Sequence, residues 1–183
     1  MKDIIRRTSE TEVRIRVSRG EGRSRVEVED AFLRHMLETF ARYSGLDLEV
    51  EAEGDLRHHL VEDVGLTLGV AIRDLAGENV ARFGWCLLPM DETLAEAAID
   101  VGGRPYFVGE AGAPLYTHFL HSFAMSLDAT LHVRVIRGGD RHHVVEAVVK
   151  AVGTALKQAL VEQESIFSTK GRVRMERGEE GEA

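Results

Sequence analysis

The sequence His-His-x-x-Glu occurs twice in this chain, at residues 58–62 and 142–146. On a helix, residues four apart share one face, whereas neighbouring residues diverge by about 100°. Each copy therefore offers one His/Glu pair that can chelate an ion and one histidine that points elsewhere. Imidazole nitrogen and carboxylate oxygen form a ligand set for a divalent transition metal. A single copy would fit a solvated helix face equally well, but its recurrence favours two metal centres.

Length and charge limit the classes of protein to which the chain can belong. Its 183 residues suffice for one domain with a sizeable core, without disulfides or structural zinc. The formal net charge of -8 opposes binding to nucleic acid or to an anionic membrane, so an anionic ligand needs a local basic cluster. No apolar run approaches the roughly 20 residues of a membrane span, and the first residues lack a signal-peptide core. We therefore expect a cytoplasmic protein, in which the single cysteine, Cys86, is a small core residue.

Hydrophobic periodicity predicts a similar series of elements in the two halves of the chain. In the first half we expect a hairpin of strands 13–17 and 25–29, a helix over 31–43 capped by Asp30 and ended by Gly45, a strand over 46–52, a helix over 57–75 and a strand over 81–88. In the second half we expect strands over 94–101 and 106–108, a helix over 115–127 and a helix over 141–160. Each His-His copy thus lies near the start of a predicted helix.

The two halves also match residue by residue, which indicates an internal duplication. His118 follows His35 by 83 residues, and the same offset relates further apolar pairs, namely Leu37 and Leu120, Phe40 and Phe123, Leu48 and Leu131, and Val50 and Val133. The second His-His copy follows the first by 84 residues. Their matching positions make His35 and His118 candidate metal ligands. His121 and His132 have no histidine counterpart and are expected to take no part in metal binding.

These patterns predict an α+β fold made of one duplicated domain, residues 1–183. Each half reads as strands, helix, strand, helix, which we interpret as a β-β-β-α-β-α-like repeat with helices packed on one face of its sheet. We expect the first repeat at about 1–88 and the second at about 89–172. Residues 173–183 are expected to form a short arm and a disordered acidic tail.

Several further motifs occur in a fixed order along the chain. They are Arg-x-Thr-x-Glu-Thr at residues 6–11, Phe-x-x-His-Met-Leu at 32–37, Arg82-Phe83-Gly84, Pro89-Met90-Asp91-Glu92, Gly103-Arg104-Pro105, Lys150, and Ser168-Thr169-Lys170-Gly171. With the two His-His-x-x-Glu copies, this order resembles the imidazoleglycerol-phosphate dehydratase family. The resemblance extends from residue 7 to residue 171.

The resemblance implies an enzyme of histidine biosynthesis that dehydrates D-erythro-imidazole-glycerol phosphate to imidazole-acetol phosphate. It implies two Mn²⁺ ions per active site, which hold the substrate ring as an imidazolate, although the ligand set also suits other divalent metals. It further implies a homo-oligomer of 24 subunits with active sites between subunits. The expected partner is a small phosphate-bearing substrate, not nucleic acid or membrane.

The resemblance also assigns roles to particular residues. The implied metal ligands are His35, His58, His59, Glu62, His118, His142, His143 and Glu146. The implied substrate and phosphate contacts are Arg82, Arg104, Lys150, Ser168 and Lys170. Candidate acid–base residues are Glu10, Glu62, Glu146 and Asp91, and the sequence does not choose among them. We place His58 and Glu62 on one metal and His142 and Glu146 on the other, and leave open how the other four histidines divide across halves or subunits.

The chain departs from the family pattern at a few positions outside the ligand set. These are Arg34 in place of Asp, Thr39 in place of Gln, Tyr43 in place of His, Gly102 in place of Ser, Phe167 in place of Pro, and a short segment between Asp55 and His58. Two alternatives to the dehydratase remain open, the first because it would fit the same ligands and the second because of these departures. One is a divergent dinuclear metal hydrolase, and the other is a non-catalytic, metal-dependent shell-forming paralogue.

Overall fold

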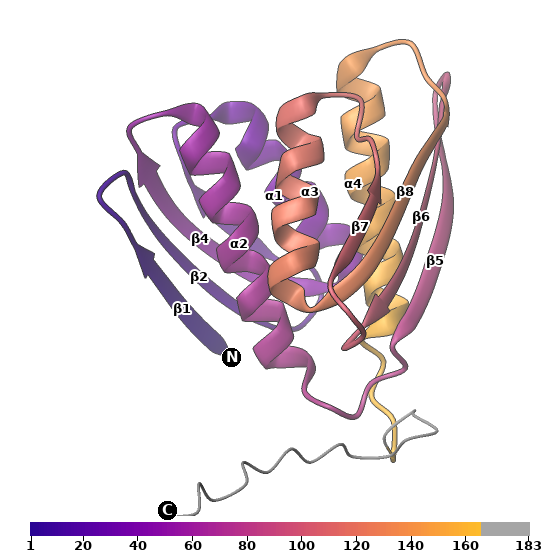
Figure 1. Ribbon diagram of the computed structural model, residues 1–183, viewed down its shortest axis with the longest axis horizontal. Helices are drawn as coiled ribbons and strands as arrows, with labels where there is room; N and C mark the ends of the chain where they lie inside the picture. Colours follow the sequence, from indigo (N-terminus) through magenta and orange to yellow (C-terminus); the bar gives the residue numbers. More distant parts are fainter. Residues whose placement is uncertain (166–183) are drawn as a thin grey trace, which may run out of the picture.

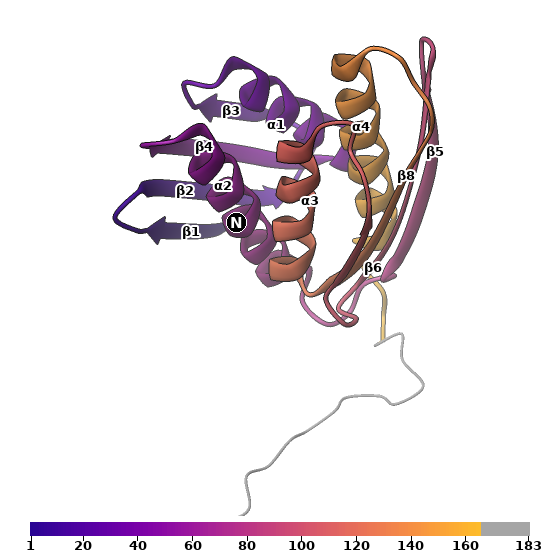
Figure 2. The same cartoon turned by 45° about the horizontal axis from the view of Figure 1, so that its top comes forward.

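In the computed structural model, which describes residues 1–165, two four-stranded sheets enclose four helices (Figures 1 and 2). The elements of the first half are β1 (Lys2–Arg7), β2 (Thr11–Arg19), β3 (Ser24–Glu27), α1 (Ala31–Ser44), β4 (Leu46–Gly54) and α2 (Arg57–Ala76). Those of the second half are β5 (Phe83–Met90), β6 (Thr93–Val101), β7 (Tyr106–Gly109), α3 (Pro114–Leu127), β8 (Ala129–Arg137) and α4 (Arg141–Ala159). Both halves run β-β-β-α-β-α, which confirms the predicted α+β duplication.

Helix ends follow the predicted capping residues. The Asp30 carboxylate accepts a hydrogen bond from the N–H of Leu33 at 2.8 Å, and Gly45 ends α1 in the left-handed region at φ 69°. Asp140 caps α4 by accepting from the N–H groups of His142 and His143. None of the helices within residues 1–165 combines the length and apolar character that a membrane span requires.

The predicted hairpin of strands 13–17 and 25–29 is wrong. The first sheet has the order β1-β2-β4-β3, so β4 lies between the two strands, antiparallel to β2 and parallel to β3. The intervening segment crosses the end of β4, where the Asp47 carboxylate accepts from the N–H groups of Glu21 and Arg23 at 3.0 and 2.9 Å. Because α1 joins β3 to β4, the two become parallel neighbours through a helical crossover.

The edge strands of the two sheets also differ from the sequence prediction. β1 was not predicted, because this edge strand is exposed along most of its length and shows no alternation. β5 pairs with β6 in the second sheet, whose order is β5-β6-β8-β7. The second four-stranded unit therefore begins at Phe83, and our boundary between repeats at residues 88 and 89 is too late. Cys86, on β5, is partly buried against the core as expected.

Two glycines on α2 allow it to approach α3 closely. A Cβ atom at Gly65 would lie 2.9 Å from the carbonyl oxygen of Phe119, and one at Gly69 would lie 2.9 Å from the backbone nitrogen of Leu127. Both distances are shorter than van der Waals contact allows. The small residues thus set the separation of the two helices, and α3 carries one candidate metal ligand, His118.

We expect Gly69→Val to destabilise the protein by about 3 kcal/mol or more, because the added side chain must push α3 away from α2. Urea unfolding monitored by circular dichroism measures the change. Gly139→Ala is the control, since a Cβ there would meet only the Glu92 side chain, at 3.9 Å. An unchanged unfolding midpoint for Gly69→Val would show that close approach of the two helices is unnecessary.

Candidate metal centres

The first centre joins α2 of the first half to α3 of the second. The Oε2 atom of Glu62 lies 3.6 Å from Nε2 of His58 and 3.1 Å from Nε2 of His118. The two imidazole rings stack with centroids 5.0 Å apart. All three ligand atoms lie within 4.8 Å of one another, as the ligands of one ion must.

The second centre repeats this arrangement with α4 of the second half and α1 of the first. Oε2 of Glu146 lies 3.0 Å from Nε2 of His142 and 3.4 Å from Nε2 of His35. The rings of His35 and His142 stack at 5.6 Å, and the three ligand atoms again lie within 4.8 Å of one another. Each centre therefore takes a His/Glu pair from one half and its third ligand from the other.

Helix packing explains how the candidate ligands divide between the two halves of the chain, which the sequence did not determine. Within the helical layer α2 packs on α3 and α1 packs on α4 (Figure 2). The histidine of each shorter helix is consequently presented to the His/Glu pair of the other repeat. Neither repeat has a complete candidate centre without the other.

The donor sets fit a divalent cation. Two imidazole nitrogens and one carboxylate oxygen suit a transition metal and leave coordination positions for other ligands or substrate. Nε2 of His118 is buried and makes no hydrogen bond with the residues described. A buried ring nitrogen directed at a carboxylate without a hydrogen bond is readily explained as a metal ligand.

The second histidine of each pair points away from its own helix's centre and contacts an acidic side chain. Nδ1 of His59 lies 2.8 Å from Oδ1 of Asp55 and 3.6 Å from Oε2 of Glu10, and these three form a third acidic cluster. Nδ1 of His143 lies 2.9 Å from Oε2 of Glu92. The bond from Asp55 raises the pKa of His59, and the bond from Glu92 raises that of His143. A carboxylate at Nδ1 fixes the ring and directs Nε2 outward, as in many metal-ligating histidines.

The structure places Glu92, and not Asp91, at the position that matches Glu10. Thr11 opens β2 and Thr93 opens β6, so the residues just before these strands correspond. Asp91 lies between β5 and β6 at φ 48°, and like Glu92 it belongs to none of the three groups within residues 1–165 that could hold a metal ion. Hydrogen bonds from the Asp140 N–H and from His143 lower the pKa of Glu92 to about 2. The 82-residue offset between the two threonines is the sequence signal that identifies Glu92.

Two of the proposed phosphate contacts lie far from both centres on the same chain. The Arg82 side chain makes two hydrogen bonds to Asp100, at 3.0 and 2.9 Å, and its backbone N–H binds the carbonyl of Ala159 at the end of α4. The His/Glu pairs of the two centres lie at the N-terminal ends of α2 and α4. At 1.5 Å per residue, the N-terminal end of α4 is roughly 20 Å from the C-terminal end that Arg82 contacts. The Arg104 carbonyl accepts from Thr130 near the start of β8, at the same end of the sheet as Arg82. Ser168 and Lys170 lie outside the described residues.

Lys150 belongs to the second centre and makes the two centres unequal. Its Nζ atom lies 2.9 Å from Oε1 of Glu146 and 5.4 Å from the ring centroid of Tyr43. Burial opposes the charge on Glu146, but the hydrogen bonds from Lys150 and His35 outweigh it and lower the pKa of Glu146. Lys150 follows Glu146 by four residues, and the residue four after Glu62 is Leu66. This position therefore supplies no positive charge to Glu62. Glu62 is also more exposed, at 35% of its side chain against 12% for Glu146.

A model of the family described as imidazoleglycerol-phosphate dehydratase matches residues 29–156 of this chain. This chain belongs to the imidazoleglycerol-phosphate dehydratase family. The enzyme of that name from Chlorobaculum tepidum is 41% identical over 185 residues, 92% of this chain and 95% of the relative. The one from Pyrobaculum arsenaticum is 44% identical over 183 residues, 91% of this chain and 97% of the relative.

Solved structures of the dehydratase family share this fold. The Pyrococcus furiosus enzyme superposes with a TM-score of 0.84 at 37% identity, covering 93% of this chain and all of that one. The Staphylococcus aureus enzyme gives 0.78 at 32% identity, covering 88% and 99%. Family membership confirms the expected hydro-lyase of histidine biosynthesis and does not favour the hydrolase or the non-catalytic shell protein.

Proposed function

We propose that this chain converts D-erythro-imidazole-glycerol phosphate to imidazole-acetol phosphate with two Mn²⁺ ions at each active site, in the cytoplasm. The observation that carries the proposal is the pair of matching centres, His58/Glu62/His118 and His142/Glu146/His35. A divalent cation bound at each centre would act as a Lewis acid toward a substrate ring nitrogen and stabilise developing negative charge. Two matched centres suit an imidazole ring, which has two nitrogens.

Loss of water from the substrate diol removes a proton from one carbon and hydroxide from its neighbour, so a base is required. Glu62 and Glu146 lie within the ligand sets. Glu92 has a pKa of about 2, which makes it a weak base at neutral pH. Glu10 lies beside His59 with half of its side chain exposed, and we propose it as the base.

We propose further that the active site lies between subunits of a 24-subunit homo-oligomer. Arg82 and Arg104 lie too far from the centres of their own chain to bind the phosphate of a small substrate held there. His59 and His143 direct Nε2 away from the centre on their own helix. A neighbouring subunit would supply the basic side chains that bind the phosphate. It would also supply histidine ligands for the coordination positions that each centre leaves open.

A turnover assay with the purified chain, the substrate and Mn²⁺ tests the proposed reaction. We expect metal-dependent formation of the ketone product without release of inorganic phosphate. Release of phosphate would support the hydrolase, and metal binding without any reaction would support the shell-forming paralogue.

The loop that contains Lys170 supplies a separate prediction about phosphate binding, which rests on the family resemblance. We expect Lys170→Ala to raise KM roughly ten- to a hundredfold, because a charge-assisted hydrogen bond contributes about 1.5 to 3 kcal/mol. We expect a smaller fall in kcat and unchanged metal content. Lys157→Ala, at an exposed lysine in the last turn of α4, is the control. Unchanged KM in Lys170→Ala would remove this lysine from the phosphate site, and loss of metal would give it a structural role.

A further inference from the structure

A buried carboxylate lies directly beside the first candidate centre. Asp63 follows Glu62 on α2, and only 8% of its surface is exposed. Neighbouring residues of a helix point about 100° apart, so Asp63 faces the first sheet while Glu62 faces the centre. A carboxylate withdrawn from water is costly unless hydrogen bonds or an opposite charge satisfy it.

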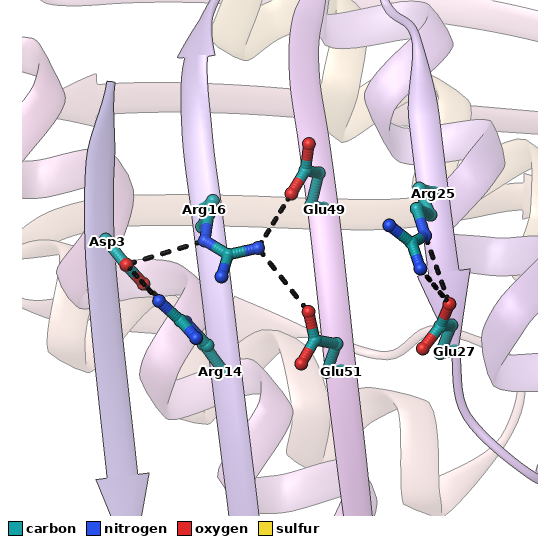
Figure 3. A network of polar contacts seen from close by, with 7 residues as sticks. All are labelled: Asp3, Arg14, Arg16, Arg25, Glu27, Glu49 and Glu51. Atoms are coloured by element: carbon teal, nitrogen blue, oxygen red, sulfur yellow. Dashed lines mark hydrogen bonds and ion pairs between the residues drawn. The ribbon is translucent and has the colours of Figure 1, made fainter.

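The first two strands of the first sheet supply the partners of Asp63. On the outer face of this sheet, Asp3 of β1 pairs with Arg14 of β2 (Figure 3). Side chains alternate along a strand, so Arg6 of β1 points to the inner face, where its Nε atom lies 2.9 Å from Oδ1 of Asp63. The other carboxylate oxygen, Oδ2, accepts a hydrogen bond from the hydroxyl of Thr11 on β2. Both oxygens of the buried carboxylate are therefore engaged.

From Thr11 the contacts continue into the connection between β1 and β2. The hydroxyl of Thr8 lies 3.1 Å from that of Thr11, and it accepts the N–H groups of Glu10 and Thr11 at 3.1 and 2.9 Å. The carbonyl of Glu10 accepts the N–H of Asp55, two residues before α2 begins, at 3.0 Å. Asp63 is thus linked through two threonine hydroxyls to the backbone of Glu10.

The second repeat has the same helix and strands but lacks this carboxylate. The residue that follows Glu146 on α4 is Ala147, which is fully buried. Thr93 opens β6 as Thr11 opens β2, and its hydroxyl lies 3.3 Å from Oε1 of Glu92 instead. The same packing of helix on sheet therefore forms with an alanine at this position, so the buried carboxylate of the first repeat calls for a reason other than the fold.

The matching glutamates of the two repeats are held by different parts. The carboxylate of Glu92 accepts the backbone N–H groups of Gly139 and Asp140, at 3.3 and 2.9 Å. Glu10 is held by its backbone, and within residues 1–165 its carboxylate has one ion-pair partner, His59 at 3.6 Å. A general base needs this arrangement, because its carboxylate must meet the substrate from a fixed position without being occupied by other donors.

We propose that Asp63 is a positioning residue, which places the Glu10 carboxylate for proton removal by fixing the connection between β1 and β2. The inference rests on the proposed role of Glu10 as the base. Asp63 acts through the hydroxyls of Thr11 and Thr8, and it contacts neither the substrate nor the ion. Loosening the connection should therefore slow the reaction while substrate and metal bind as before.

Two single substitutions test the link at different points. Asp63→Ala copies the second repeat and should lower kcat roughly ten- to a hundredfold, with KM and manganese bound per chain nearly unchanged. Thr11→Val has almost the shape of threonine, leaves Arg6 paired with Asp63, and should give a similar loss. Thr11→Ser keeps the hydroxyl and should retain most of the wild-type kcat. Wild-type kcat in Asp63→Ala, or equal losses in the two Thr11 variants, would overturn the proposal.

A double-variant cycle separates positioning from a general loss of structure. Once the Glu10 carboxylate is absent its placement no longer matters, so Asp63→Ala should lower kcat no further in a Glu10→Ala chain. The same fall in both backgrounds would mean that Asp63 does not act through Glu10. Asp47→Ala is the matched control, because this carboxylate fixes the β2–β3 connection through Glu21 and Arg23 at the other end of the sheet. It should leave kcat unchanged.

Amide hydrogen exchange separates this inference from the proposed function, because it requires no turnover. In Asp63→Ala we expect the peptide that contains residues 8–11 to exchange at least about tenfold faster than in the wild type, and in Asp47→Ala we expect no change there. Faster exchange together with a fully active Glu10→Ala chain would refute the proposed base and leave Asp63 as the anchor of the connection. Unchanged exchange in Asp63→Ala would overturn the inference whatever the activity.

Discussion

His58→Ala and His142→Ala should each lower kcat/KM at least about a thousandfold, although the two residues lie in different halves of the chain. Each variant removes one of the two imidazoles that lie beside the carboxylate of a candidate centre. Loss of a single preorganised stabilising group costs roughly 10² to 10³ in rate, and loss of a bound Lewis acid should cost more. Steady-state kinetics at saturating Mn²⁺, beside metal analysis, measure the effect.

His121→Ala is the control for these two variants. His121 lies less than one turn from His118 on α3 but belongs to none of the three-residue clusters found within residues 1–165. We expect it to retain both metals and most of its activity. If either His58→Ala or His142→Ala kept near-normal turnover, the two centres would not be equally required and the dinuclear proposal would fail.

Replacing Lys150 with methionine should tighten metal binding at the second centre at least about tenfold. Lys150 orients Glu146 through Oε1, but its charge also opposes a divalent cation at Oε2. At about 5 Å and an effective dielectric constant near 20 this repulsion reaches several kcal/mol before screening, whereas orientation by such a group contributes roughly 1.4 to 3 kcal/mol. Calorimetric titration of the wild type with metal should therefore resolve a tighter site and a weaker site. In Lys150→Met the affinities of the two sites should become similar.

The first centre provides the reciprocal variant. Leu66→Lys places a lysine four residues after Glu62, as Lys150 follows Glu146, and should weaken that centre. Two equal affinities in the wild type, unchanged by either substitution, would show that orientation of Glu146 offsets the charge of Lys150.

Features of the fold that depend on local pattern were predictable from the sequence. The His-His-x-x-Glu copies, the Asp30 and Gly45 caps and the 83-residue offset predicted α1, α2, α3 and α4, and with them the six residues that the fold brings together in the two candidate centres. Strand pairing was not predictable, because the hairpin interpretation considered only β2 and β3, and the insertion of β4 between them depends on the crossover through α1.

Three features of the site depend on packing that the sequence does not reveal. His35 joins Glu146 because α1 packs on α4, and no spacing within one half indicates this. Glu92 was missed in favour of its neighbour Asp91, since only the register of β2 and β6 distinguishes them. Arg82 is separated from both centres because it contacts the C-terminal end of α4, whereas the second His-His-x-x-Glu copy lies at the N-terminal end of that helix. The order of the motifs along the sequence does not reveal this distance.

Turnover measured against manganese bound per chain tests the central claim, that two matched centres serve one dehydration, most directly. Because Lys150 should make the second centre weaker, stepwise addition of metal should yield a chain with one ion before a chain with two. We predict almost no turnover at one equivalent per chain and a rise in activity only as the second equivalent binds. Full activity at one equivalent would contradict the claim.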